Sequence, residues 1–194
     1  MTNKIKILAI SGSTRKSSSN LNLIHAIADL AAESFEVSIF EGLSELPHFN
    51  PDDIDHVSAA VTAFKEQLNA ADGILICTPE YAIGVPGTLK NAIDWTVSSM
   101  EFSKKPVALI TAATSGAISH QSLLGTLLIL ESRITGDTQL IISAVKSKIS
   151  ANNEITDRVT LNQVEKLIRS LTGIINGTAK EMDFLPAPVL MNGD

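Results

Sequence analysis

The amino terminus of the chain changes abruptly from an apolar run to a polar loop and then to a helical pattern. Residues 4–10 read Lys-Ile-Lys-Ile-Leu-Ala-Ile, and residues 11–20 are rich in serine. A short, almost continuous apolar run is typical of a central strand in a parallel sheet that is covered on both faces. After the loop, Leu21, Ile24 and Ile27 recur at helical spacing. The sequence therefore predicts a strand-loop-helix unit at the amino terminus.

The loop of this unit has the composition of an anion-binding site. A loop between a buried strand and a helix brings backbone N–H groups and the positive end of the helix dipole to one point. Ser13, Ser18 and Asn20 could add neutral donors there, and Arg15 could add a charged one. Taken alone, the loop is explained equally well by ordinary turn chemistry with Asn20 as a helix cap. It matches neither of the two stronger glycine-rich nucleotide motifs.

The length and composition of the chain are those of one α/β domain. Of the 194 residues, 44% are hydrophobic and 19% are charged, which is ample for a core but short for two domains. We expect a single domain at residues 1–177 and a tail at 178–194. The net charge of −6 argues against a nucleic-acid or membrane partner, and no apolar stretch has the length of a leader or a bilayer span. A cytoplasmic protein with a small-molecule partner is expected.

Metal and disulfide chemistry are not expected from the sequence. Cys77 is the only cysteine, and the four histidines show no ligand spacing with one another. Since Cys77 ends an apolar run, we expect it to be a small buried hydrophobic residue.

Strands and helices alternate along the whole predicted domain. After the first unit, the pattern predicts strands at 35–40, 74–77, 107–112 and 140–145, and helices at 55–71, 88–99, 121–133 and 160–175. This alternation implies a doubly wound parallel sheet with right-handed crossovers. Five strands favour the order 2-1-3-4-5.

Three polar loops follow strands that this order places side by side. They are residues 11–20, 79–87 and 114–117. In such a sheet, ligands bind outside the carboxyl ends of the strands, here between strands one and three. We therefore expect the three loops to form one crevice, and this convergence indicates a binding site more strongly than any single loop does.

Two of these loops carry a family resemblance. Residues 12–15 are Gly-Ser-Thr-Arg, with Ser18 and Asn20 after them, and residues 79–81 are Pro-Glu-Tyr, followed by Pro-Gly-Thr-Leu-Lys-Asn-Ala-Ile-Asp-Trp at 86–95. In these stretches the chain resembles the NAD(P)H-dependent FMN reductase family, which includes quinone, azo-dye and chromate reductases. The resemblance extends over most of the chain, to Gly177.

The resemblance implies a flavodoxin-like fold that binds FMN non-covalently and uses NADPH or NADH as reductant. It implies a phosphate site made of Ser13, Arg15, Ser18 and Asn20. It places Pro79, Glu80, Tyr81, Ala82 and Ile83 along the isoalloxazine ring, with Ser115 and Gly116 on the other side. The chain departs from the family at Ala82, where Asn is usual, and at Ser119-His120, near which a Gly-Gly pair is common.

The implied activity leaves the chemistry to the flavin. Hydride would pass from NAD(P)H to FMN and then to a flavin, quinone or similar acceptor in a ping-pong cycle, so no catalytic side chain is expected. Glu80 is expected to orient its loop rather than to act as an acid. Tyr81 is the only aromatic residue in the three loops, which leaves one face of the ring open.

Two other classes of protein share this sheet order. The alternative function is that of a non-enzymatic, flavodoxin-type electron carrier. NAD(P)H reduces the bound flavin directly in a reductase but not in such a carrier. A phospho-acceptor receiver needs acidic residues after strand one and an aspartate at the end of strand three. The chain has Ser11-Gly12 and Thr78-Pro79 at those places, which disfavours a receiver.

The predicted helix at 121–133 is apolar over more of its circumference than one sheet face can cover. Its apolar residues are Leu123, Leu124, Leu127, Leu128, Ile129 and Leu130. This pattern predicts a homodimer or homotetramer whose partner subunit covers the remainder. The alternative is that the chain's own tail covers the helix.

Overall fold

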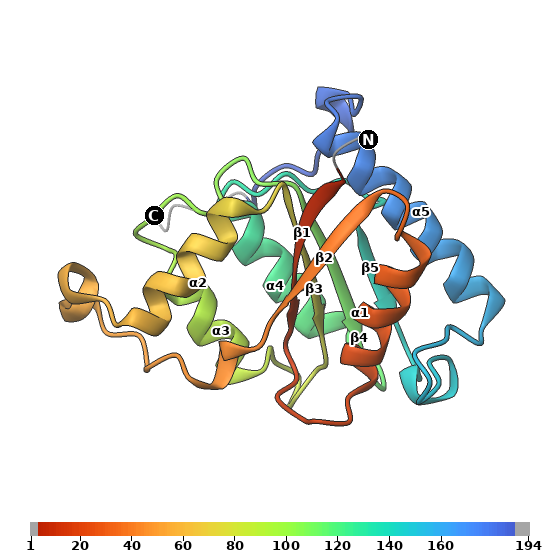
Figure 1. The fold of residues 1–194 in the computed structure, drawn as a ribbon, viewed down its shortest axis with the longest axis horizontal. Coiled ribbons are helices and arrows are strands. Elements are labelled where there is room, and N and C mark those ends of the chain that lie inside the picture. The colour runs from red at the N-terminus through yellow and green to blue at the C-terminus, as the bar shows by residue number, and fades with distance from the viewer. Residues whose placement is uncertain (1–3, 189–194) are drawn as a thin grey trace, which may run out of the picture.

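In the computed structural model, which describes residues 4–188, the chain forms a parallel sheet with helices on both faces (Figure 1). The five strands are β1 (Ile5–Ser11), β2 (Phe35–Phe40), β3 (Gly73–Thr78), β4 (Val107–Ala112) and β5 (Gln139–Ile142). They lie in the order β2-β1-β3-β4-β5, and every neighbouring pair is parallel. The predicted flavodoxin-like sheet is confirmed.

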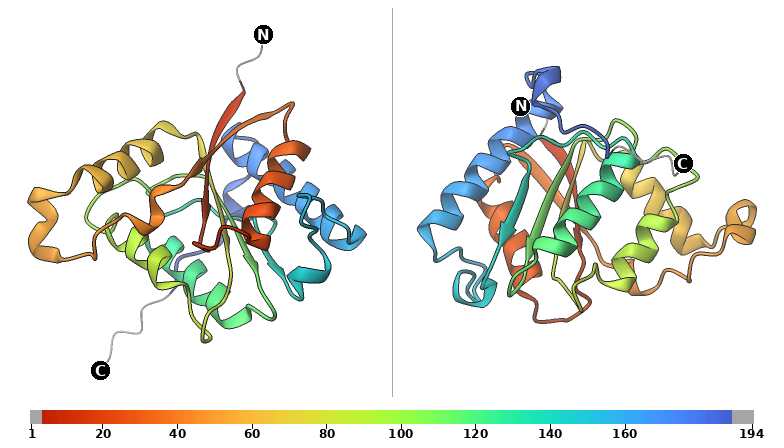
Figure 2. Two further views of the ribbon diagram at one scale, coloured as in Figure 1. Left: turned by 60° about the horizontal axis from the view of Figure 1, so that its bottom comes forward. Right: turned by 180° about the vertical axis from the view of Figure 1, so that it is seen from behind.

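Helices form a layer on each side of this sheet. They are α1 (Ser19–Leu30), α2 (Ala59–Ala70), α3 (Gly87–Asp94), α4 (Ala117–Ile129) and α5 (Arg158–Ile175). The two views of Figure 2 show α1 and α5 on one face of the sheet and α2, α3 and α4 on the other. One core cluster joins the sheet to α1 and α5, and the other joins it to α2, α3 and α4. In β1, Ile7 and Ala9 belong to the first cluster, whereas Leu8 and Ile10 belong to the second. Burial on both faces explains why the central strands β1, β3 and β4 are almost entirely apolar, whereas the edge strand β2 carries Glu36 and Ser38.

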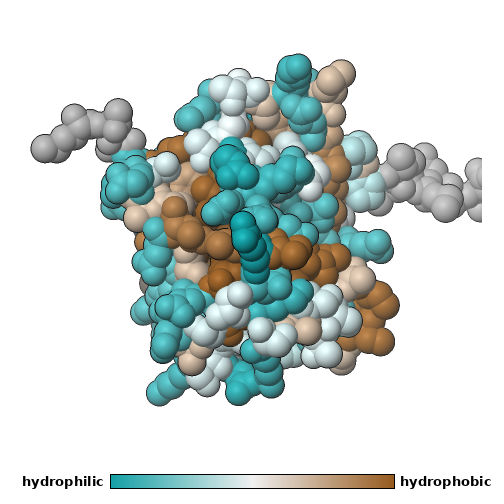
Figure 3. Space-filling model, turned by 90° about the vertical axis from the view of Figure 1, so that its right-hand side faces the viewer, coloured by the Kyte–Doolittle hydropathy of each residue, from teal (hydrophilic) through white to brown (hydrophobic). Residues whose placement is uncertain are grey.

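α5 differs from the central strands because only one of its faces is buried. Val164, Leu167 and Leu171 face the core, and most of the intervening residues are partly or fully exposed. Figure 3 looks at the side of the molecule that carries α5, and it shows polar side chains interspersed with smaller apolar areas. No helix in residues 4–188 combines the length and hydropathy that a membrane span requires.

Two helices begin elsewhere than the periodicity predicts. α2 begins at Ala59, not near residue 55. The side chain of Ser58 caps this helix by accepting a hydrogen bond from Val61 N, and residues 51–56 form a separate 3-10 helix. α4 begins at Ala117, not at residue 121. The earlier start of α4 places its first turn at the carboxyl edge of the sheet.

The loop after β2 is fastened to α3. Asn91 donates through Nδ2 to Pro47 O at 2.9 Å and accepts at Oδ1 from Phe49 N at 2.7 Å. The indole of Trp95 donates to Pro47 O at 2.8 Å and packs edge-on against Phe49, with ring centroids 5.2 Å apart. Trp95 is buried, so this residue and Asn91 support the loop.

The described part of the tail packs against the body. Leu185 N donates to Ile134 O at 2.8 Å, and the guanidinium of Arg133 lies 4.3 Å from the centroid of the Phe184 ring. A Cβ added at Gly125 of α4 would lie 3.6 Å from Cγ of Pro188, so Pro188 packs close to this helix. The tail therefore covers part of α4. Residues 189–194 lie outside the described range.

Two glycines give a matched test of packing at the end of β1. A Cβ on Gly12 would lie 2.2 Å from Thr78 Oγ1, whereas a Cβ on Gly87, at the start of α3, would meet nothing within 4 Å. We expect Gly12→Ala to destabilise the fold by about 1–3 kcal/mol through overpacking. Gly87→Ala should be neutral or stabilising by up to about 1 kcal/mol. Urea unfolding of both variants checks this, and equal stabilities would contradict the packing argument.

Candidate functional site

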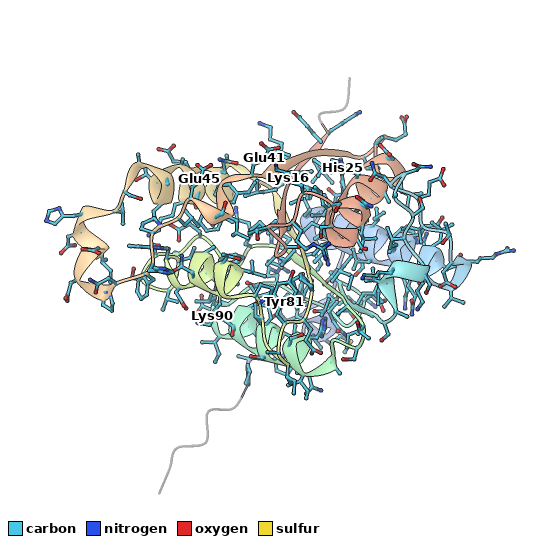
Figure 4. The ribbon with its side chains drawn as sticks, turned by 90° about the horizontal axis from the view of Figure 1, so that it is seen from below. Lys16, His25, Glu41, Glu45, Tyr81 and Lys90 are labelled. Carbon is cyan, nitrogen blue, oxygen red and sulfur yellow. The ribbon has the colours of Figure 1, made fainter. Side chains whose placement is uncertain are left out.

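The carboxyl ends of the central strands surround one cavity of about 390 Å³. Figure 4 looks onto this edge of the sheet, with Tyr81 near the middle of the view. The volume lies in the range of about 300–1,000 Å³ that small-molecule sites occupy. The lining residues come from four strand-end loops: Ser13, Arg15, Ser17, Ser18, Ser19, Asn20, Pro79, Glu80, Tyr81, Ala112, Ala113, Thr114, Ala144, Val145, Lys146 and Ser147.

The loop after β1 presents hydroxyl groups and a helix N-terminus to the cavity. Ser13 Oγ accepts from Arg15 N at 3.4 Å, and Ser18 Oγ accepts from Asn20 N at 3.2 Å. In both cases the hydroxyl acts as an acceptor, so its own hydrogen is available to a ligand. Arg15 is exposed and forms no ion pair with any described residue. Together with the N-terminus of α1, these groups suit a phosphate.

Asn20 does not act as the helix cap that turn chemistry alone suggests. Ser18, not Asn20, caps α1. The buried Asn20 amide donates through Nδ2 to Ala112 O at 3.1 Å, and its Oδ1 has no protein partner. Asn20 thus connects the first turn of α1 to the end of β4, and a second amide hydrogen remains for a ligand.

Glu80 connects two of the loops. Its Oε1 accepts from Ser115 Oγ at 2.9 Å and from Gly116 N at 3.3 Å, and its Oε2 accepts from Ser119 N at 3.2 Å. These donors stand at the N-terminus of α4, where the helix dipole also favours a negative charge. The backbone N–H of Ser119 and the Ser115 hydroxyl hold the pKa of the Glu80 carboxyl below its ordinary value. Glu80 therefore orients its loop, as the sequence suggests.

A tight turn follows Glu80. Tyr81 N donates to Gly84 O at 3.0 Å, and Gly84 N donates to Tyr81 O at 2.9 Å. The two residues between them, Ala82 and Ile83, have φ values of +48° and +66°. Two positive φ values define a type I′ turn, for which Asn-Gly is the preferred pair. The Asn that the family usually has at position 82 suits this turn, whereas Ala-Ile does not.

The sequence-predicted residues divide into two groups. Ser13, Arg15, Ser18, Asn20, Pro79, Glu80 and Tyr81 line the cavity. Ala82, Ile83, Ser115 and Gly116 lie on the same loops outside its lining, and Ser115 and Gly116 use their donors on Glu80.

Sequence reasoning missed the wall formed by residues 144–147. This segment follows β5 and is held against the loop after β4, because Ala144 N donates to Thr114 O and Val145 N to Ala113 O. It brings Lys146 to the cavity as a second cation. The sequence predicts a strand at 140–145, but β5 ends at Ile142, which leaves residues 144 and 145 in the loop. Only the rule that ligands bind at the carboxyl ends of parallel strands could have indicated this part of the site.

The Ser119-His120 pair has a structural role in α4. His120 is buried, with Nδ1 2.9 Å from Thr111 Oγ1 and Nε2 2.6 Å from Gln139 Oε1. Because an amide oxygen only accepts, Nε2 carries the hydrogen and Nδ1 accepts from Thr111. Burial lowers the pKa of His120, which favours this neutral form. His120 thus joins α4 to β4 and β5.

This geometry defines a class of protein: a flavodoxin-like domain with a hydroxyl-rich loop and a helix N-terminus at the switch point between β1 and β3. The family model described as NADPH-dependent FMN reductase matches residues 5–147. The chain belongs to this family. It is an NAD(P)H-dependent flavin or quinone reductase, and the predictions of family, enzyme class and FMN as cofactor are confirmed.

Curated relatives resemble the chain over most of its length. It is 35% identical over 162 residues to the 2-hydroxy-1,4-benzoquinone reductase of Burkholderia sp, covering 80% of this chain and 88% of that protein. It is 30% identical over 172 residues to the quinone reductase of Escherichia coli strain K12, covering 84% and 92%.

A solved structure supports the fold. The flavoenzyme NAD(P)H:(acceptor) oxidoreductase FerB from Paracoccus denitrificans superposes with a TM-score of 0.73 at 24% identity. The superposition covers 93% of this chain and all of FerB.

The Glu80 contacts predict a pH dependence of stability. Because the folded-state pKa lies below the ordinary 4.5, the stabilisation is present above about pH 4.5 and is lost as the pH falls through the folded-state value. Glu80→Gln should lower Tm at pH 7 and reduce the further loss of Tm between about pH 5 and pH 3. Glu66→Gln, on the exposed side of α2, is the control. Parallel Tm curves for wild type and Glu80→Gln would contradict this role.

Proposed function

We propose that this cavity holds FMN and that the chain transfers hydride equivalents from NADPH or NADH to a small flavin or quinone acceptor in a ping-pong cycle. The convergence of four strand-end loops on one cavity, with a helix N-terminus and hydroxyl donors at one end, carries the proposal. When bound, FMN supplies the redox chemistry, accepting hydride from nicotinamide and passing electrons to the acceptor.

The protein residues bind and orient the cofactor in this proposal. Ser13, Ser18 and Arg15 would hold the phosphate with the N-terminus of α1. Residues 79–81 would lie along the ring, with Glu80 fixing their course. Tyr81 is the only aromatic side chain of the cavity lining. One face of the ring would then stay open for nicotinamide and acceptor in turn, which distinguishes a reductase from an electron carrier.

Direct reduction by nicotinamide tests this function. Under anaerobic conditions, the purified protein with FMN should lose its flavin absorbance on addition of NADPH or NADH, and an added quinone should restore it. Failure of both nicotinamides to bleach the flavin, in a protein that dithionite still reduces, would favour the carrier.

Removal of the Arg15 charge should weaken cofactor binding. A charge-assisted hydrogen bond contributes about 1.5–3 kcal/mol, so Arg15→Ala should raise the Kd for FMN by roughly ten- to a hundredfold. Flavin fluorescence titration measures this. Arg169→Ala on α5, which lies outside the cavity lining, is the matched control. An unchanged Kd for Arg15→Ala would rule out the phosphate assignment.

We also propose a homodimer or homotetramer. In α4, Leu123, Leu127 and Leu128 are buried in the body, but Ile129 stays exposed. Ile129 lines a shallow groove with Val97 and Met100, which are also exposed. A second copy that covers this groove would bury Val97, Met100 and Ile129, whereas Pro188, in the described part of the tail, lies near Gly125, one turn earlier in α4. Light scattering at micromolar concentration should give at least twice the chain mass; a monomer would contradict the proposal.

A further inference from the structure

Two segments beside the cavity, the loop after β3 and the first turn of α4, expose large apolar side chains. Ile83, in the turn after Glu80, is 63% exposed, and Ile118, in the first turn of α4, is 61% exposed. Tyr81, which lines the cavity, is 49% exposed. Such side chains contribute little to the core, so their positions call for another explanation.

Glu80 joins these two segments. Its carboxylate binds the backbone N–H groups of Gly116 and Ser119, which stand on either side of Ile118 in the sequence. The next residue after Glu80 is Tyr81, the first residue of the tight turn. The segment 81–83 and the first turn of α4 therefore belong to the same side of the cavity mouth. The cationic residues Arg15 and Lys146 come from the other lining loops.

The turn at this place is strained. A β-branched residue at positive φ is unfavourable, and Ile83 has a φ of +66°. Burial does not compensate for the strain, because the side chain is largely exposed. The two hydrogen bonds between Tyr81 and Gly84 and the Glu80 contacts keep the backbone in this conformation. Strain that the surrounding structure maintains is common at ligand sites.

We propose that Tyr81, Ile83 and Ile118 form an apolar rim that selects the electron acceptor. This inference rests on the proposed function, in which the cavity holds FMN. The rim would contact the part of a planar acceptor that extends beyond the flavin ring. It would favour apolar quinones over small charged acceptors, because only an apolar acceptor gains from burying the isoleucine side chains. Ile83 and Ile118 are thus specificity residues.

Two variants of the rim and one control test the proposal. The double variant Ala82→Asn with Ile83→Gly gives the turn its preferred residues and removes the apolar side chain. Ile118→Thr removes apolar surface from α4. Val159→Thr changes an exposed side chain at the start of α5, outside the cavity lining. Each protein is assayed with 1,4-naphthoquinone and with ferricyanide, and FMN affinity and Tm are measured separately.

We expect both rim variants to lower kcat/KM for 1,4-naphthoquinone by roughly three- to tenfold more than they lower kcat/KM for ferricyanide. FMN affinity of Ile118→Thr should stay the same, and Tm of the double variant should rise by about 2–4 °C because the turn is relaxed. The Val159→Thr protein should match the wild type throughout.

Equal changes for both acceptors, or no rise in Tm of the double variant, would overturn the proposal while leaving the FMN site intact. A wild-type protein that fails to bind FMN would overturn the proposed function, and the rim with it.

Discussion

The contact between Glu80 and the N-terminus of α4 is the interaction on which the site depends. α4 begins after Gly116, a residue at φ +100° with no side-chain cap of its own, so the capping acceptors come from a loop 36 residues earlier in the chain. The same contact fixes the course of the loop after β3. The N-termini of α1 and α4 both point toward the carboxyl edge of the sheet, but Glu80 fills one of them. The N-terminus of α4 is thereby closed to an external anion, whereas the N-terminus of α1 borders the cavity.

Much of the fold could be predicted from the sequence because its signals are local. The buried strands are continuous apolar runs, the helices have a clear period, and the sheet order follows from their alternation. The start of α4 could not be predicted, because its cap lies on another loop. The cavity wall at 144–147 overlaps the strand predicted at 140–145, whereas β5 ends at Ile142. The turn at Ala82-Ile83 contradicts the residue preferences of its own conformation, so only the structure identifies it.

The longest stretch that resembles the family is mainly structural. In α3, Asn91 and the following Trp95 hold the loop at 47–49, and Lys90 pairs with Asp94 one turn later. None of these residues lines the cavity. The motif at 86–95 therefore supports the loops around the site, whereas the cavity itself is lined by residues of the shorter segments 13–20, 79–81, 112–114 and 144–147.

Cys77, the only thiol of the chain, lies fully buried in β3, where desolvation raises the pKa of the thiol. Thiolate is the reactive form of cysteine, so alkylating reagents cannot modify this residue until the central strand opens. The rate of alkylation then reports on opening of the sheet itself. A cysteine introduced at an exposed position would carry a fluorescent label as the sole modified site.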